Sequence, residues 1–344
     1  MLLNRLKSQG LIHPPQWLPS TTHYLCLMGS VAYGVSGDDS DSDIYGFCVP
    51  PKEMVFPHLA GEIQGFGRQI KRFEQWQEHH IRDVDAGKEY DFQVYNIVKY
   101  FQLSMENNPN MCDALFVPER CVIHCNAIGN MVRENRKLFL HRGCWHKFRG
   151  YAYSMVHKMS IKNPEEGSKR CELIRQFGMD TKYAYHVVRL VYEVEQMLTT
   201  GDLDLESNSE TLKAIRRGEW TEQRVIDFFA QKEKALNKAY EESILPYAPD
   251  ESKIKKLLLE CLEHHFGSLD KAYVEPDRYK NALLEIQEIC AKLRMRSRCR
   301  PRLCILESRN SPKSSWLSRW PGNSSRTNGS GSPKVCRLGR WRPS

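Results

Sequence analysis

The sequence predicts an α+β fold, in which a small mixed sheet within residues 1–119 is followed by a mostly helical domain at 120–293. Two observations support this assignment. Short apolar or alternating segments, bounded by turn residues, have the two-residue period of β-strands at 24–28, 44–49 and 89–95. Apolar residues then recur at helical spacing from about residue 127 onward.

The helical elements are predicted from their spacing and their end signals. A short helix precedes a Pro-rich lead-in that ends at Pro19, and the segment 63–81 has no clear period. The clearest helix begins after Asp180, a good N-cap, and ends before Gly201, a good stop signal. The full set of expected helices is 96–105, 127–139, 144–161, 180–198, 210–217, 221–242, 251–264 and 277–293.

Charge divides the chain unevenly. The whole chain carries +8, but residues 294–344 hold 13 Lys or Arg and one acid, Glu307, which leaves −4 for residues 1–293. This basic segment is rich in Arg, Ser, Pro and Gly and is predicted to be disordered. It is either a tail that binds nucleic acid without sequence preference or an out-of-frame extension, and its deletion is expected to leave folding and catalysis intact.

Composition excludes several classes of protein. No apolar run is long enough to span a membrane, and the first ten residues lack the apolar core of a secretory signal. The 12 cysteines are scattered through a chain of ordinary globular composition, which is untypical of a disulfide scaffold. We therefore expect a cytoplasmic protein with mostly buried thiols and no membrane partner.

The segment 28–46 contains the most informative motif. Gly29 lets a phosphate approach the backbone, and Ser30 adds a hydroxyl at the start of a short helix. Asp41 and Asp43 stand two apart before an apolar strand, so both carboxylates lie on one face. Paired carboxylates bind Mg²⁺, and beside a phosphate-binding turn they indicate phosphoryl or nucleotidyl transfer. Solvated turn residues are the simpler alternative.

A third carboxylate is expected on the strand 89–95. Asp91 and Glu89 share one face of this strand, and Tyr90 and Phe92 share the other. Asp91 is the preferred third metal ligand and catalytic residue, with Glu89 in reserve. A surface strand that carries two solvated acids is the alternative.

Three nitrogen-bearing side chains lie on one stripe of the helix 180–198. Lys182, His186 and Arg189 are spaced four and three residues apart, which places them on one helical face. This stripe is predicted to contact a nucleotide or an RNA backbone. An ion-paired surface helix, or a histidine buried in the core, is the alternative.

Together these motifs resemble the polymerase β-like nucleotidyltransferase superfamily, and more closely its RNA-repair-pathway branch. The resemblance covers about residues 22–293. It rests on Gly29-Ser30, Ala32-Tyr33-Gly34, Asp41-Ser42-Asp43 with Gly46, Asn108-Pro109, Asp113, Leu115-Phe116, Lys182, His186, Arg189-Leu190 and the segment 215–220. Asp113 departs from the family, which often has Glu there, and it is assigned no role.

The resemblance implies a metal-dependent enzyme that moves a nucleoside monophosphate from an NTP, such as ATP, to a hydroxyl acceptor. Asp41, Asp43 and Asp91 would hold Mg²⁺ or Mn²⁺. Gly29, Ser30, Lys182, His186 and Arg189 would bind the nucleotide. The acceptor is an RNA end, with a protein or a small molecule as the alternative. A non-catalytic RNA-binding module is a further alternative.

Other motifs are weaker. The Cys and His residues of segment 121–125 lack the second well-spaced pair of a structural zinc site. The pair His79-His80 is predicted either to face the active site or to lie on a helix surface, and the pair His264-His265 has no matching motif.

Overall fold

The computed structural model describes residues 1–35, 42–67, 69, 71–161 and 166–268, and five helical residues at 283, 286, 287, 289 and 290. Residues 1–278 form one compact unit, and residues 279–344 form a second. Asp41, the segment 294–344 and most of the helix expected at 277–293 lie outside the described residues. The division at 119/120 therefore falls inside one compact unit and stays a sequence-based proposal.

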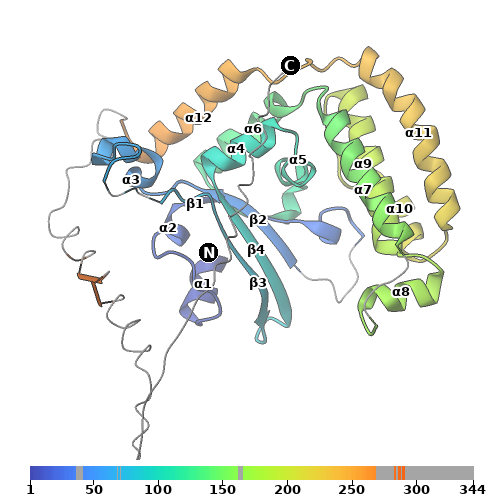
Figure 1. The fold of residues 1–344 in the computed structure, drawn as a ribbon, viewed down its shortest axis with the longest axis horizontal. Helices are drawn as coiled ribbons and strands as arrows, with labels where there is room; N and C mark the ends of the chain where they lie inside the picture. The colour runs from blue at the N-terminus through green and yellow to red at the C-terminus, as the bar shows by residue number, and fades with distance from the viewer. Residues whose placement is uncertain are drawn as a thin grey trace, which may run out of the picture. The chain divides into compact units, whose positions relative to one another are not determined.

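A five-stranded mixed sheet forms the centre of the first unit, in the order β3-β4-β2-β1-β5 (Figure 1). Strands β2 and β4 run parallel, and every other neighbouring pair runs antiparallel. The strands are β1 (Thr22–Leu27), β2 (Ser42–Cys48), β3 (Gln75–Asp83), β4 (Lys88–Asn96) and β5 (Val122–Cys125). The predicted α+β fold with a mixed sheet is confirmed.

The two faces of the sheet are covered by different parts of the chain. Leu25, Ile44 and Phe92 point to one face, where they pack with residues of α1 (Leu2–Ser8) and α2 (Leu18–Thr21). Tyr24, Phe47 and Tyr95 point to the opposite face and join the core of the helical part. Alternation along each strand thus separates the two cores. Asp43 is four residues before Phe47 and Asp91 is four residues before Tyr95, so both aspartates point to the face that the helical part covers.

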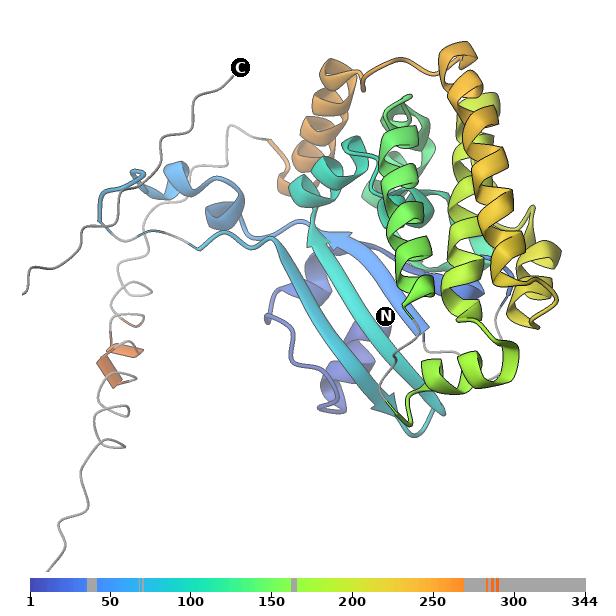
Figure 2. The same ribbon diagram turned by 45° about the vertical axis from the view of Figure 1, so that its right-hand side comes forward.

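The helical part is arranged around α9 (Thr181–Thr200), which packs against α7, α8, α10 and α11 (Figure 2). Asp180 caps α9, because its Oδ1 accepts from the backbone N–H groups of Lys182 and Tyr183, and Gly201 ends it in a left-handed conformation. The other helices are α3 (Lys52–Val55), α4 (Ile97–Met105), α5 (Pro109–Phe116), α6 (Ala127–Glu134), α7 (Cys144–Ser160), α8 (Lys169–Phe177), α10 (Ser209–Arg216), α11 (Glu222–Glu242) and α12 (Glu251–Phe266).

Strands β3 and β5 and helices α5 and α8 were not predicted. β3 is a polar edge strand with an irregular register, so its apolar period is broken. All four residues of β5 are half-buried, which removes the alternation that marks a strand. Asn107-Asn108-Pro109 ends α4 as expected, but it also begins α5, because Asn108 caps the new helix and Pro109 occupies its first turn. Within the described residues, no helix is both long and apolar enough to cross a bilayer.

Candidate active site

The Gly-Ser turn follows β1 directly. Gly29 and Ser30 begin a three-residue 3-10 helix, Gly29–Val31, as the motif predicts for a short helix. Gly29 adopts φ +68°, a left-handed conformation that side chains rarely tolerate. A Cβ atom on Gly29 would stand 2.5 Å from Oδ2 of Asp43, so only glycine permits this approach of the carboxylate to the turn.

Asp43 and Asp91 are direct register partners on the parallel strands β2 and β4. Side chains at paired positions of neighbouring strands point to the same face, so the two carboxylates lie side by side. The backbone N–H of Met28 also donates to the carbonyl of Asp43 at 2.8 Å, which ties the end of β1 to the beginning of β2. The structure thus brings together Gly29, Asp43 and Asp91 at one end of the sheet.

Glu89 lies on the same face as Asp91 but is engaged elsewhere. Its carboxylate oxygens contact Nδ1 of His80 at 2.9 Å and Nε of Arg82 at 3.4 Å. The hydrogen bond with His80 lowers the pKa of Glu89. Because Asp91, not Glu89, is paired with Asp43, the geometry favours Asp91 as the third carboxylate.

The residues present fit a magnesium site completed by substrate. No three His, Cys, Asp or Glu side chains gather into a metal site within the described residues, a set that does not include Asp41. Mg²⁺ typically uses one or two carboxylates and takes its remaining ligands from water and substrate phosphates. Asp43 and Asp91, adjacent on one face and beside Gly29, provide such a pair.

Helix α9 lies against the Gly-Ser turn, because the Arg189 guanidinium is 4.4 Å from the centre of the Tyr33 ring. Lys182 and His186 form a partly exposed surface of this helix, here called the basic surface. Tyr185, next to His186 on this helix, is buried, and burial raises the pKa of its hydroxyl. Lys182 is exposed, and half-buried His186 lies against Tyr185 with ring centroids 4.2 Å apart. Burial, reinforced by Arg189 and other cations, lowers the pKa of His186 well below its ordinary value, so this ring is neutral at pH 7.

Arg189 is inside the protein rather than on that surface. Its side chain is only 6% exposed, and Nη1 donates to Oδ2 of Asp113 and, at 2.8 Å, to Oε1 of Glu193. The hydroxyl of Tyr33, from the Gly-Ser turn, donates to the same Asp113 oxygen at 2.7 Å. Burial raises the pKa of both Asp113 and Glu193. The buried cluster of Tyr33, Asp113, Arg189 and Glu193 therefore connects the turn with α5 and α9.

Two further arginines hold the turn from the helical side. Arg120 donates from Nη2 to the carbonyl of Val31 at 2.9 Å, and the same nitrogen lies 2.6 Å from Oε1 of Glu206. Arg216, at the end of α10, donates from Nη1 to the carbonyl of Val35 at 2.8 Å. Its guanidinium lies 5.6 Å from the centre of the Tyr185 ring. Arg216 is exposed and lies beside Tyr185, the neighbour of His186, and is therefore grouped with Lys182 and His186 in the basic surface.

Comparison with family models identifies the family of this chain. The model of the RlaP family, described as the RNA repair pathway DNA polymerase beta family, matches residues 12–279. The chain belongs to this family. The family assignment predicted from the motifs is confirmed, and with it membership of a polymerase β-like nucleotidyltransferase family linked to RNA repair.

Two other comparisons add little to the family assignment. Among solved structures, the chain is similar to a nucleotidyltransferase-like protein from Exiguobacterium sibiricum, with 12% identity, a TM-score of 0.26, and coverage of 76% of this chain and 72% of that one. A search of curated proteins finds no match.

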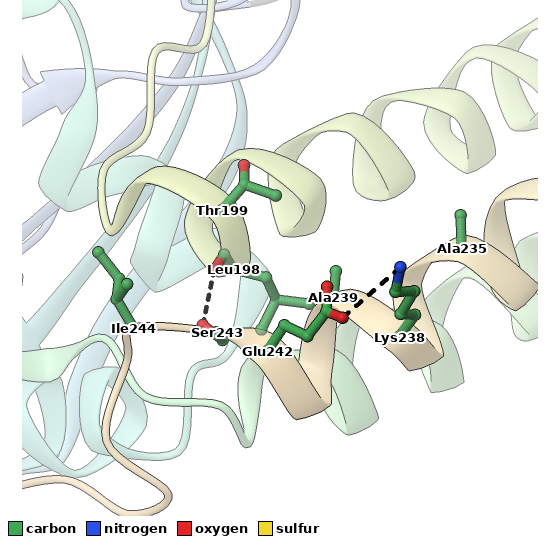
Figure 3. A pocket seen from close by; sticks show the side chains of 8 residues that line it. All are labelled: Leu198, Thr199, Ala235, Lys238, Ala239, Glu242, Ser243 and Ile244. Atoms are coloured by element: carbon green, nitrogen blue, oxygen red, sulfur yellow. Dashed lines mark hydrogen bonds and ion pairs between the residues drawn. The ribbon is translucent and has the colours of Figure 1, made fainter.

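The cavities described in this RlaP-family chain lie away from the carboxylates. One, of about 300 Å³, lies between the carboxyl-terminal parts of α9 and α11 (Figure 3). Around it Ser243 donates to the carbonyl of Leu198 at 2.6 Å, and Lys238 pairs with Glu242 at 3.6 Å. A second, of about 470 Å³, is lined by residues that include Arg133 and Arg136. Neither contains a predicted site residue.

Several residues near the site were missed by the sequence analysis. Arg216 lies in the segment 215–220 that carries the family resemblance, so the motif marked it without assigning a role. Tyr185 and Asp113 were given no role. His79 and His80 lie on β3 beside Asp91, not on a helix surface. In the segment 121–125, Cys121 ends a 3-10 helix and residues 122–125 form the edge strand β5, and both cysteines are free thiols.

Proposed function

We propose that this chain is a metal-dependent nucleotidyltransferase that moves a nucleoside monophosphate from an NTP to a hydroxyl on an RNA end. The observation that carries the proposal is the pairing of Asp43 with Asp91, with the Asp43 carboxylate against Gly29, in a chain of the RlaP family. Carboxylates beside a phosphate-binding turn are what this reaction requires.

Among the sheet residues, we propose that the aspartates bind the metal ion and that the Gly-Ser turn binds the phosphates. Asp41, Asp43 and Asp91 hold Mg²⁺ or Mn²⁺, which supplies charge neutralisation and makes the acceptor hydroxyl more acidic. Gly29 and Ser30 bind the β- and γ-phosphates. The acceptor oxygen forms a bond to the α-phosphorus as the bond to pyrophosphate breaks, and the hydroxyl proton passes to solvent or to a carboxylate.

On the helical side we propose that Lys182, His186 and Arg216 face the nucleotide. Lys182 and Arg216 are exposed cations, and a neutral imidazole at His186 can donate one hydrogen bond without a charge. Arg189 was predicted to contact the nucleotide directly. Because its guanidinium is occupied by Asp113 and Glu193, we now propose that it acts through the turn, by holding Asp113 against Tyr33.

The experiment measures transfer of α-³²P label from each of the four NTPs, with Mg²⁺ or Mn²⁺, into RNA and protein from a bacterial extract and into small aminols. Label on RNA with one NTP supports the proposal and identifies the nucleotide. Label on protein or an aminol instead supports the alternative acceptors, with which the net charge of −4 on residues 1–293 is also compatible.

Matched variants separate catalysis from folding. Asp43→Asn and Asp91→Asn each remove one charge with little change of shape, and each is expected to lower kcat by at least 100-fold. Glu89→Gln, on the same face of β4, is the control and is expected to retain kcat within about threefold, because its amide oxygen can still accept a hydrogen bond from the ring of His80. Equal activity of Asp91→Asn and Glu89→Gln would contradict the proposed carboxylate set, and wild-type protein that binds RNA without any label transfer would favour a non-catalytic RNA-binding module.

A further inference from the structure

The edge strand β3 contains a bulge directly opposite Asp91. Glu78 pairs with Phe92 and Ile81 pairs with Tyr90, so two residues of β3, His79 and His80, stand opposite the single residue Asp91. An extra residue of this kind bends the strand and redirects its backbone groups. The bulge is therefore located at the one β4 position that carries the proposed third carboxylate.

The bulge redirects a backbone donor to the Asp91 side chain. The N–H of His80 donates to Oδ1 of Asp91 at 2.7 Å, a short and therefore strong hydrogen bond to a carboxylate. Nδ1 of His79 lies 3.6 Å from the same oxygen. In a regular antiparallel ladder a strand N–H meets a backbone carbonyl, not a side chain. Because a carboxylate is planar, fixing Oδ1 also fixes the direction in which Oδ2 points.

The backbone of His80 is strained at this point. His80 has φ +57°, in the left-handed region that a residue with a Cβ rarely adopts. Such a conformation costs on the order of 1 kcal/mol or more and persists only where its surroundings hold it. Here Nδ1 of His80 contacts Oε1 of Glu89 at 2.9 Å, which secures the imidazole on the neighbouring strand. Strained backbone conformations of this kind are common at functional sites.

We propose that the His79–His80 bulge is a positioning device for Asp91: it holds Oδ1 so that Oδ2 is directed to the metal ion shared with Asp43. His79 and His80 are positioning residues, since they act through Asp91. The inference rests on the proposed function, because it assigns Asp91 to metal binding. Partners that orient a metal ligand typically contribute 10- to 100-fold to metal affinity.

The test compares substitutions that change the backbone preference of residue 80 while keeping its N–H. His80→Gly adopts positive φ freely, so the bulge and its hydrogen bond to Asp91 remain. His80→Val disfavours positive φ most strongly because its side chain is β-branched. Binding of Mn²⁺ is measured by electron paramagnetic resonance with a non-hydrolysable NTP present, and thermal unfolding is measured on the same samples.

We expect His80→Val to weaken Mn²⁺ binding about tenfold and His80→Gly to leave it within about twofold of wild type. If His80→Val does not fold, His80→Ala is compared with His80→Gly under the same criterion. Equal Mn²⁺ affinity of the folded variants would overturn the inference, since a merely structural bulge would move only the melting temperature. Asp91→Asn with unchanged Mn²⁺ affinity would instead overturn the assignment of Asp91 to the metal, on which the inference depends.

Discussion

Substitution of Gly29 tests the contact between the turn and the Asp43 carboxylate. In Gly29→Ala the new methyl group would meet Asp43 Oδ2 at 2.5 Å, whereas real contacts of this kind are at least 3.0 Å, so the carboxylate must move by roughly half an ångström or more. A displacement approaching 1 Å at a reacting site costs on the order of 100-fold in rate. A side chain at φ +68° also costs roughly 1–2 kcal/mol of stability.

Gly10→Ala separates the two effects. Gly10 has φ +71°, and a Cβ atom there would meet nothing within 4 Å, so this variant has the backbone strain without the clash. Both variants are expected to lose roughly 1–2 kcal/mol in denaturant unfolding. Only Gly29→Ala is expected to lose about 100-fold in kcat for label transfer at saturating Mg²⁺ and NTP. A kcat for Gly29→Ala within threefold of that for Gly10→Ala would refute the proposed contact.

Three further predictions concern charge. Burial lowers the pKa of His23 from its ordinary 6.5 to about 4, so the contribution of the neutral ring to stability is complete above about pH 7 and is lost as the pH falls toward 4. In urea unfolding, the loss of stability between pH 7.5 and pH 5 should be about 2 kcal/mol larger in wild type than in His23→Gln, because other histidines with a lowered pKa, such as His186, titrate in both proteins. Arg189→Met leaves two buried carboxyl groups without their cation and should cost roughly 3–5 kcal/mol in the same assay. Lys182→Met, on the exposed side of the same helix, should change stability by less than about 0.5 kcal/mol. Lys182→Met and Arg216→Met should each raise the Kd for NTP. An unchanged Kd in both variants would contradict the proposal that the basic surface binds the nucleotide.

The sheet half of the site was predictable because its signals are local. A glycine at a turn and an Asp-x-Asp before an apolar strand each follow from a few neighbouring residues, and Gly29 and Asp43 lie where those signals place them. The choice between Asp91 and Glu89 was not local. It depends on which β4 residue is paired with Asp43, and parallel pairing of β2 with β4 joins strands separated by β3 in the chain. No spacing within β4 specifies that register.

The helical half was harder to predict because α9 is enclosed. A stripe of three residues predicts a common exposed face only when the rest of the helix is buried on one side. α9 is packed by four other helices, so its stripe passes from the exposed Lys182, through the half-buried His186, to the buried Arg189. The predicted helical spacing of the three residues was correct, but their solvent exposure falls from Lys182 to Arg189. Arg216, from a different helix, is exposed and lies beside Tyr185 of α9, and the sequence analysis gave it no role.

Net charge is a poor guide to this site because its charges are arranged by position. Residues 1–293 carry −4, yet the exposed cations Lys182 and Arg216 lie on helices that contact the Gly-Ser turn. In physiological salt the field of an exposed cation is screened over a Debye length of roughly 8–10 Å. The attraction for a bound NTP would therefore depend on how near these cations are to its phosphates and not on the total charge of the chain. Arg216 has a second task, because it also holds the carbonyl of Val35. Under the proposed function, this one side chain would both hold the Gly-Ser turn and face the nucleotide, so the helical part would contribute to the site as well as to the fold.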